Sequence, residues 1–142
     1  VTDHEIYTFN DGARADSWEL TDGHERLYLE RSVDEDEEEW SLSTVLPIDR
    51  LDGVRRHILE HDDPPETVEH GGKTYRLDWS VGGSVHPAEG GDERRLIEWE
   101  LLDPSEEHFL AIQQWSETEF TAAEGKTVEP YLFTHILPGS AE

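Results

Sequence analysis

The sequence predicts a mainly β domain, an antiparallel rolled sheet or barrel-like fold with one short α-helix near residues 49–60. Apolar and polar residues alternate over most of the chain, which is typical of half-buried strands. Turn-forming pairs such as Asp22-Gly23 and Gly71-Gly72 separate these stretches at short intervals. Many short strands divided by close turns are typical of an antiparallel sandwich or barrel.

The clearest strand covers residues 75–81, where Tyr75, Leu77, Trp79 and Val81 alternate with polar residues and are expected on one face. The glycine-rich stretch 82–91 follows, and it predicts a flexible hairpin loop. The same alternation predicts further strands at Ile6–Phe9, Trp18–Leu20, Leu27–Arg31, Trp40–Leu46, Ile97–Leu101, Phe109–Trp115, Glu119–Ala122 and Leu132–Leu137.

One segment departs from the period of two. Ile48, Leu51, Val54 and Ile58 are spaced three, three and four residues apart, which predicts an amphipathic helix from about Asp49 to Glu60. Asp49 is the expected N-cap, and the prolines that follow the helix begin a linker.

A chain of 142 residues predicts a single domain over residues 1–142. Its halves, about 1–62 and 66–142, resemble one another, because Trp18-Glu19-Leu20 recurs as Trp99-Glu100-Leu101. Each half would bury its aromatic face against the other, since a lone hairpin is only marginally stable.

Charge is the most unusual feature of the composition. The chain has 35 acidic and 11 basic residues, a formal net charge of −24, and its only lysines are Lys73 and Lys126. Self-repulsion on this scale is screened in concentrated salt, which indicates a halophilic, haloarchaeon-like protein surrounded by hydrated monovalent cations. The same charge argues against nucleic acid as a partner. The lack of cysteine suits a cytoplasmic location, and no apolar run is long enough for direct membrane insertion.

Two patterns are candidate metal sites. His57-Ile58-Leu59-Glu60-His61 fits the H-x-x-E-H zinc pattern, in which two histidines one helical turn apart share a Zn²⁺ ion. The alternative is a pair of boundary histidines on an amphipathic helix. The acidic run 34–39 offers Asp34, Asp36 and Glu38 as oxygen ligands for a divalent cation, although the run fits the solvated tip of a hairpin better.

A set of short motifs occurs in the second half of the chain: Gly72–Leu77, Trp99–Leu101, Phe109–Trp115, Glu119-Phe120, Gly125–Val128 and Ile136–Gly139. In these motifs the chain resembles the uncharacterised prokaryotic family called domain of unknown function 4178. Gln113-Gln114-Trp115 stands where Glu-Arg-Trp is common in that family. The resemblance implies an accessory role beside phage-shock-type membrane-stress proteins, and it supplies no catalytic residue and no cofactor.

Three functions follow from these observations. The first is a non-enzymatic binding or accessory module that acts through an unidentified protein partner. The alternative is a β-barrel that binds a small ligand or a cation, with polyamines as one candidate because acidic groups attract polycations. The third is a zinc-dependent hydrolase that uses His57, Glu60 and His61. The five tryptophans are expected either in the core or at a ligand-binding barrel mouth.

Overall fold

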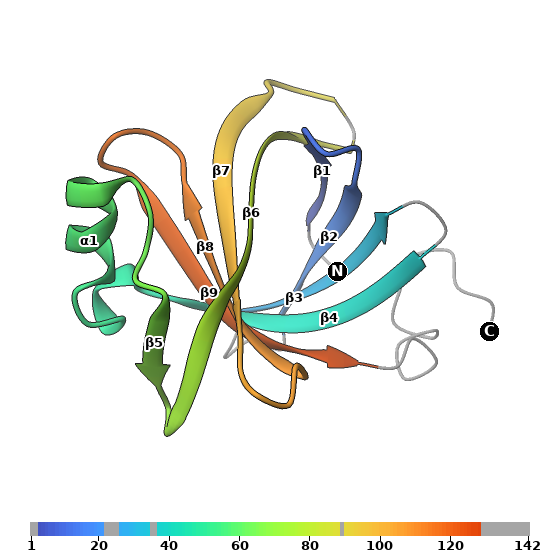
Figure 1. Cartoon of the computed structure of the whole chain (residues 1–142). Coiled ribbons are helices and arrows are strands. Elements are labelled where there is room, and N and C mark those ends of the chain that lie inside the picture. Colours follow the sequence, from blue (N-terminus) through green and yellow to red (C-terminus); the bar gives the residue numbers. More distant parts are fainter. Residues whose placement is uncertain (1–2, 22–25, 35–36, 89, 129–142) are drawn as a thin grey trace.

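The computed structural model of the chain is an antiparallel β-barrel with one short α-helix at its side (Figure 1). It describes residues 3–21, 26–34, 37–88 and 90–128. The elements are β1 (Asp3–Phe9), β2 (Arg14–Thr21), β3 (Arg26–Asp34), β4 (Glu37–Leu46), the 3₁₀ turn η1 (Ile48–Arg50), α1 (Val54–His61), β5 (Thr67–His70), β6 (Lys73–Pro87), β7 (Arg94–Leu102), β8 (His108–Gln114) and β9 (Phe120–Val128).

Eight strands close the barrel. Their order is β1-β2-β3-β4-β9-β8-β7-β6, and β6 pairs with β1 to complete the ring. Every pairing is antiparallel, so the chain forms two meanders that meet at β4–β9 and at β1–β6. The prediction of a rolled, barrel-like antiparallel sheet is therefore confirmed. The relation between the two halves by duplication stays a prediction, and the predicted strand Leu132–Leu137 lies outside the described residues.

Strand β6 closes the barrel, and it is longer than the strand predicted from the sequence. The predicted loop at Gly82-Gly83 is wrong, because β6 continues through both glycines and pairs with β1 from Gly83 to Pro87. A Cβ on Gly83 would lie 2.6 Å from the carbonyl oxygen of Thr8. The glycine therefore lets β1 approach, and it serves the seam of the barrel rather than a turn.

A β-bulge at Asp78 divides β6 into two parts. Leu77 pairs with Leu101, but Trp79 pairs with Glu100, so one extra residue is inserted in β6. The prediction that Tyr75, Leu77, Trp79 and Val81 share one face is wrong for this reason. Leu77 packs against the core outside the barrel, whereas Trp79 packs against the core inside it.

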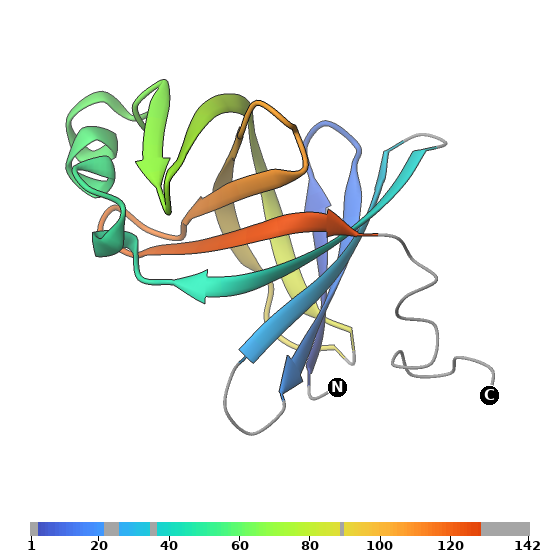
Figure 2. The ribbon, with the colours of Figure 1, turned by 90° about the horizontal axis from the view of Figure 1, so that it is seen from below.

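The larger core lies outside the barrel wall, under α1, β5 and the start of β6. Trp99 of β7 is 1% exposed there and packs with Val54 and Ile58 of the helix. Figures 1 and 2 both show α1 and β5 together on one side of the barrel. At Trp99 the outward face of β7 is thus covered by the helix. The apolar face of this strand therefore points out of the barrel, where a half-buried strand would normally have its polar face.

The smaller core fills one end of the barrel interior. Its buried members are Tyr7, Phe9, Ala13, Ala15, Val85 and Leu96. Trp79, Val81 and Trp115 pack against it, and Trp79 meets the Phe9 ring edge-on with centroids 5.5 Å apart. This apolar plug fills that end of the interior, and the rest of the interior is lined by a mixture of polar and apolar residues.

The helix is shorter than the sequence predicts. The segment from Ile48 forms a 3₁₀ turn, and the α-helix begins at Val54. The 3₁₀ turn ends at its extended C-cap, Leu51, and Gly53, with a left-handed φ of +74°, is the N-cap of α1. Asp49 is therefore not the N-cap of α1. In the described part of the chain, no helix is both long and apolar enough to cross a membrane.

Candidate functional site: an acidic cavity inside the barrel

A cavity of about 260 Å³ lies inside the barrel, next to the apolar plug. Its walls carry four glutamates, two tyrosines and several small or hydroxyl side chains. The lining residues are Glu5, Tyr7, Ser17, Tyr28, Glu30, Ser41, Ser43, Val45, Glu98, Glu100, Phe109, Ala111, Gln113, Trp115, Thr121, Ala122 and Ala123. Val45 is 55% exposed and Thr121 is also exposed, so the cavity reaches solvent beside β4 and β9.

The strand register explains how the glutamates come together. Glu5 of β1 pairs with Ser17 of β2, which pairs with Glu30 of β3, which pairs with Ser41 of β4. Paired residues point to the same side of a sheet, so this row of four lies on the inner wall. The two serines place a small side chain between the carboxylates and leave room in the cavity.

Strand β7 supplies the other two carboxylates. Glu98 and Glu100 alternate with Trp99 and Leu101, and the apolar pair is buried against the helix outside the barrel. Because successive side chains of a strand point to opposite faces, Glu98 and Glu100 must point into the barrel. Glu98 is only 7% exposed.

A hydrogen-bonded chain holds Glu98 in place. Gln113 Nε2 donates to Glu98 Oε1 at 2.7 Å, Thr121 Oγ1 donates to Gln113 Oε1 at 3.0 Å, and Trp115 Nε1 donates to Thr121 Oγ1 at 2.8 Å. The chain crosses β7, β8 and β9. It leaves the second oxygen of Glu98 for another donor, because a carboxylate accepts at both oxygens.

The interior favours the protonated form of these acids. Burial, together with the charges of Glu98, Glu100 and Glu39, raises the pKa of Glu30. Burial likewise raises the pKa of Glu98. Burial and the neighbouring Glu98 raise the pKa of Glu100 to about 7. A charge removed from water without a partner of opposite charge is costly, so burial shifts each of these groups toward its neutral, protonated form.

The same buried, acidic environment shifts the pKa of Tyr7. Burial, followed by the charges of Glu30, Glu98 and Glu5, raises the pKa of its phenol. Tyr7 therefore remains a neutral hydroxyl beside the carboxylates. No Arg, Lys or His occurs among the described residues that line the cavity, so the carboxylates meet no basic side chain of the lining.

One glycine shapes the β9 wall of the cavity. Gly125 of β9 pairs with Phe109 of β8, and a Cβ at this glycine would lie 2.6 Å from Phe109 Cζ. The missing side chain lets the phenyl ring lie across the inner face of β9. The lining thus mixes aromatic rings with the glutamates: Tyr7 lies two residues from Glu5 on β1, and Tyr28 lies two residues from Glu30 on β3.

The predicted zinc pair lies on α1, away from the cavity. The rings of His57 and His61 have centroids 4.6 Å apart, so the expected i, i+4 proximity is present. His57 Nδ1 lies 2.6 Å from the carbonyl oxygen of Asp63, and Glu60 lies 3.2 Å from Arg56 Nε. No group of three His, Asp or Glu suited to a metal occurs in the part of the chain that the structure describes. Zinc binding by this pair stays a prediction.

The predicted divalent-cation residues belong to the β3–β4 hairpin. Asp34 is the last residue of β3, and Asp36 lies outside the described residues. Glu38 accepts hydrogen bonds from Arg31 Nε at 2.7 Å and from Trp40 Nε1 at 3.0 Å. Both of its oxygens are therefore engaged by neighbouring side chains, as expected of a hairpin strand.

The tryptophans divide among three environments. Trp99 is buried in the outer core, and Trp79 and Trp115 pack against the inner plug. Trp18 and Trp40 stack on the outer face with centroids 6.0 Å apart, although β3 lies between their strands. Of the five, only Trp115 lines the acidic cavity, and a ligand-binding role for the tryptophans stays a prediction.

The sequence alone did not predict that the four glutamates point into the barrel. They stand at the polar positions of alternating strands, and such positions normally face solvent. One signal was available: an amphipathic helix needs an apolar surface to cover, and the apolar face of β7 is suited to that role. The polar face of β7 must then point the other way, into the barrel.

These features define a class: a closed eight-stranded antiparallel β-barrel with an acidic interior cavity and an external helix. The chain belongs to the family described as Domain of unknown function (DUF4178), whose match covers residues 1–130. The match includes the first half of the chain, where the quoted motifs gave no direct resemblance. An uncharacterized protein of Aquifex aeolicus (strain VF5) is 23% identical over 138 residues, which is 97% of this chain and 74% of that protein. No solved structure matches the chain.

Proposed function

We propose that the barrel binds a small organic cation, an aliphatic amine or polyamine, in its acidic cavity. The observation that carries the proposal is the set of four inward-facing glutamates, Glu5, Glu30, Glu98 and Glu100, in a cavity whose described lining has no basic residue. An ammonium group placed there would favour the ionised form of these acids and pair with their charges. Ion pairing and hydrogen bonding would then offset the cost of their burial.

The shape of the cavity supports a small, slender ligand. Its volume of about 260 Å³ lies just below the range for drug-sized small-molecule sites, roughly 300–1,000 Å³. The aromatic rings of the lining offer π faces to an ammonium group or to its methylenes. A linear diamine, with charge at its ends and carbon between them, fits a cavity whose walls carry both carboxylates and aromatic rings.

The experiment is a thermal-shift and calorimetric titration with putrescine and spermidine. Potassium chloride of equal ionic strength is the control for screening, and 1,4-butanediol is the control for shape without charge. We expect the amines to raise the melting temperature beyond the effect of the salt. The diol should have no effect.

Matched variants locate the binding site. Glu30→Gln with Glu98→Gln removes two cavity charges and should weaken amine binding at least tenfold, since a hydrogen bond to a charged group is worth about 1.5–3 kcal/mol. Glu69→Gln with Glu107→Gln makes the same change of net charge at exposed positions. Equal amine binding by both double variants would overturn the proposal.

Four further predictions from the sequence remain hypotheses. A protein partner in membrane-stress handling, a halophilic or archaeal setting, a cytoplasmic location and the lack of enzymatic activity all stay predictions. A pull-down in molar salt with a phage-shock-type protein as bait tests the partner. Recovery of the chain only in dilute buffer, where nonspecific charge effects are strongest, would count against it.

A further inference from the structure

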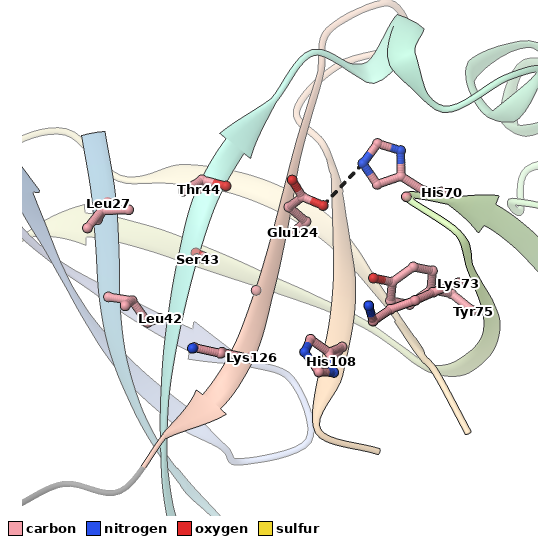
Figure 3. Close-up of a pocket in the computed structure, with 12 residues that line it drawn as sticks. Leu27, Leu42, Ser43, Thr44, His70, Lys73, Tyr75, His108, Glu124 and Lys126 are labelled. Carbon is pink, nitrogen blue, oxygen red and sulfur yellow. Dashed lines mark ion pairs between the residues drawn. The ribbon is translucent and has the colours of Figure 1, made fainter. Parts of the chain in front are cut away.

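The chain has only two lysines, Lys73 and Lys126, and both line one groove on the outside of the barrel (Figure 3). This groove, about 300 Å³ in volume, lies between the β5–β6 hairpin and the outer faces of β3, β4, β9 and β8. We name it the lysine groove. His108, Tyr75, Leu42 and Leu27 also line it.

Strand register places its polar groups. Leu42 of β4 pairs with Lys126 of β9, which pairs with His108 of β8, so the three lie in one row on the outer wall. Lys73 is held opposite, where it pairs with His70 to close the β5–β6 hairpin. Figure 3 shows His108 between the two lysine side chains.

The hairpin is fixed over the wall by two features. Gly71 and Gly72 form its turn with φ values of +59° and +79°, as a tight two-residue turn requires. His70 Nε2 lies 3.1 Å from Glu124 Oε2 of β9. This contact joins the hairpin to the barrel and gives a partner to the carboxylate of Glu124, which also lines the groove.

The nitrogen atoms of the groove have few partners. Among the described residues, neither lysine forms an ion pair within 4.0 Å, although the chain has 35 acidic residues. His108 Nδ1 is buried with no hydrogen-bond partner in the described structure. Its nearest carboxylate oxygen, Asp103 Oδ2, is 3.6 Å away. Nδ1 thus faces Asp103, and the part of the ring that meets the groove is the remainder of a side chain that is 39% exposed.

We propose that the lysine groove binds a small organic anion with an apolar body, of the class of short aliphatic carboxylates. The carboxylate lies among Lys73, Lys126 and His108, and the hydrocarbon lies along Leu27, Leu42 and Tyr75. A carboxylate accepts hydrogen bonds from all three nitrogen-bearing side chains. The leucines and the tyrosine ring offer apolar surface, which gains stability when covered.

Octanoate is the probe, followed by ¹H–¹⁵N NMR and calorimetry at constant ionic strength. We expect saturable binding with shifts at the amides of Lys73, Lys126 and His108. Octanol carries the same chain without the charge and should not saturate these shifts. Inorganic phosphate carries charge without the chain and should bind more weakly than octanoate. Phosphate binding as tight as octanoate binding would contradict the assignment to an amphiphilic carboxylate.

Three variants separate the groove from general charge effects. Lys73→Gln with Lys126→Gln should weaken octanoate binding at least tenfold, whereas Lys73→Arg with Lys126→Arg should retain it. Arg56→Gln with Arg76→Gln changes the net charge equally at exposed positions outside the groove and should leave binding unchanged. The proposal is wrong if octanoate fails to bind the wild type, or if it binds the Lys→Gln pair as tightly.

Discussion

Gln113 Nε2 donates a hydrogen bond of 2.7 Å to Glu98 Oε1 inside the barrel. The bond joins β7 to β8, where the two residues are register partners. It satisfies one oxygen of a carboxyl group that is 7% exposed and has no basic residue beside it in the described lining. The interior is thus arranged to keep acids buried, at a cost in stability that a bound cation would offset.

Stability should fall as the pH rises. Burial raises the pKa of Glu30 and Glu98, and it raises the pKa of Glu100 to about 7. The folded protein therefore holds protons that the unfolded chain, with glutamate pKa values of about 4.3, has released. Unfolding free energy should decline between about pH 5 and pH 8, by on the order of a few kcal/mol, and then level off. Urea denaturation at fixed salt measures this decline.

The variant Glu30→Gln with Glu98→Gln should flatten that pH dependence and be more stable than the wild type at pH 8. The exposed pair Glu69→Gln with Glu107→Gln is the control and should keep most of the wild-type slope. Equal slopes in all three proteins would show that the buried carboxyls do not cause the pH dependence.

Amine binding should release protons near pH 6. A bound ammonium group favours the ionised carboxylates, so protons held by Glu30, Glu98 and Glu100 leave as the ligand enters. Affinity for putrescine should therefore weaken as the pH falls below about 7. Calorimetry in two buffers with different ionisation enthalpies counts the protons. Identical heats in both buffers at pH 6 would contradict the linkage.

Gly83→Ala should open the seam between β1 and β6. The added Cβ would meet the backbone oxygen of Thr8 at 2.6 Å, and a backbone atom in a closed sheet cannot move aside. We expect a loss of about 1–3 kcal/mol in unfolding free energy, typical of overpacking. Gly82→Ala is the matched control, because its nearest neighbour is the side-chain amide of Asn10 at 2.9 Å. A loss as large for Gly82→Ala would show that the strand, not the seam, is sensitive.

Added salt should raise the melting temperature, since a net charge of −24 repels itself in dilute buffer. The salt concentration up to which the melting temperature keeps rising distinguishes simple screening from halophilic adaptation. The Debye length is about 10 Å at 0.1 M and about 3 Å at 1 M, so simple screening at long range is largely complete at the lower value. A rise that continues to molar KCl supports the halophilic setting, and a melting temperature that does not change with salt would contradict it.

The sequence was sufficient to predict the barrel because alternation and turn residues are local signals. It also located the β3–β4 hairpin, the helix and the antiparallel pairing. It missed the bulge at Asp78 and the passage of β6 through Gly82-Gly83, because both depend on which strand lies alongside. In the sequence Gly83 cannot be distinguished from a turn residue. Only the position of β1 in the structure shows that it is needed for the close approach of two strands.

The candidate site could not be predicted from the sequence, for a related reason. Alternation in β7 shows that Glu98 and Glu100 share a face, but it does not show whether that face points to solvent or into the barrel. The covering of Trp99 by α1 decides the question, and that contact joins residues more than 40 positions apart. Lys73 and Lys126 likewise meet only through the fold.

A crystal structure of the protein grown with putrescine tests the central claim most directly. It should show an ammonium group inside the barrel, within about 3 Å of carboxylate oxygens of Glu98 and Glu30, as expected for charge-assisted hydrogen bonds. An empty cavity with the diamine bound only on the outer surface, or glutamates at positions 30 and 98 turned toward bulk solvent, would contradict it.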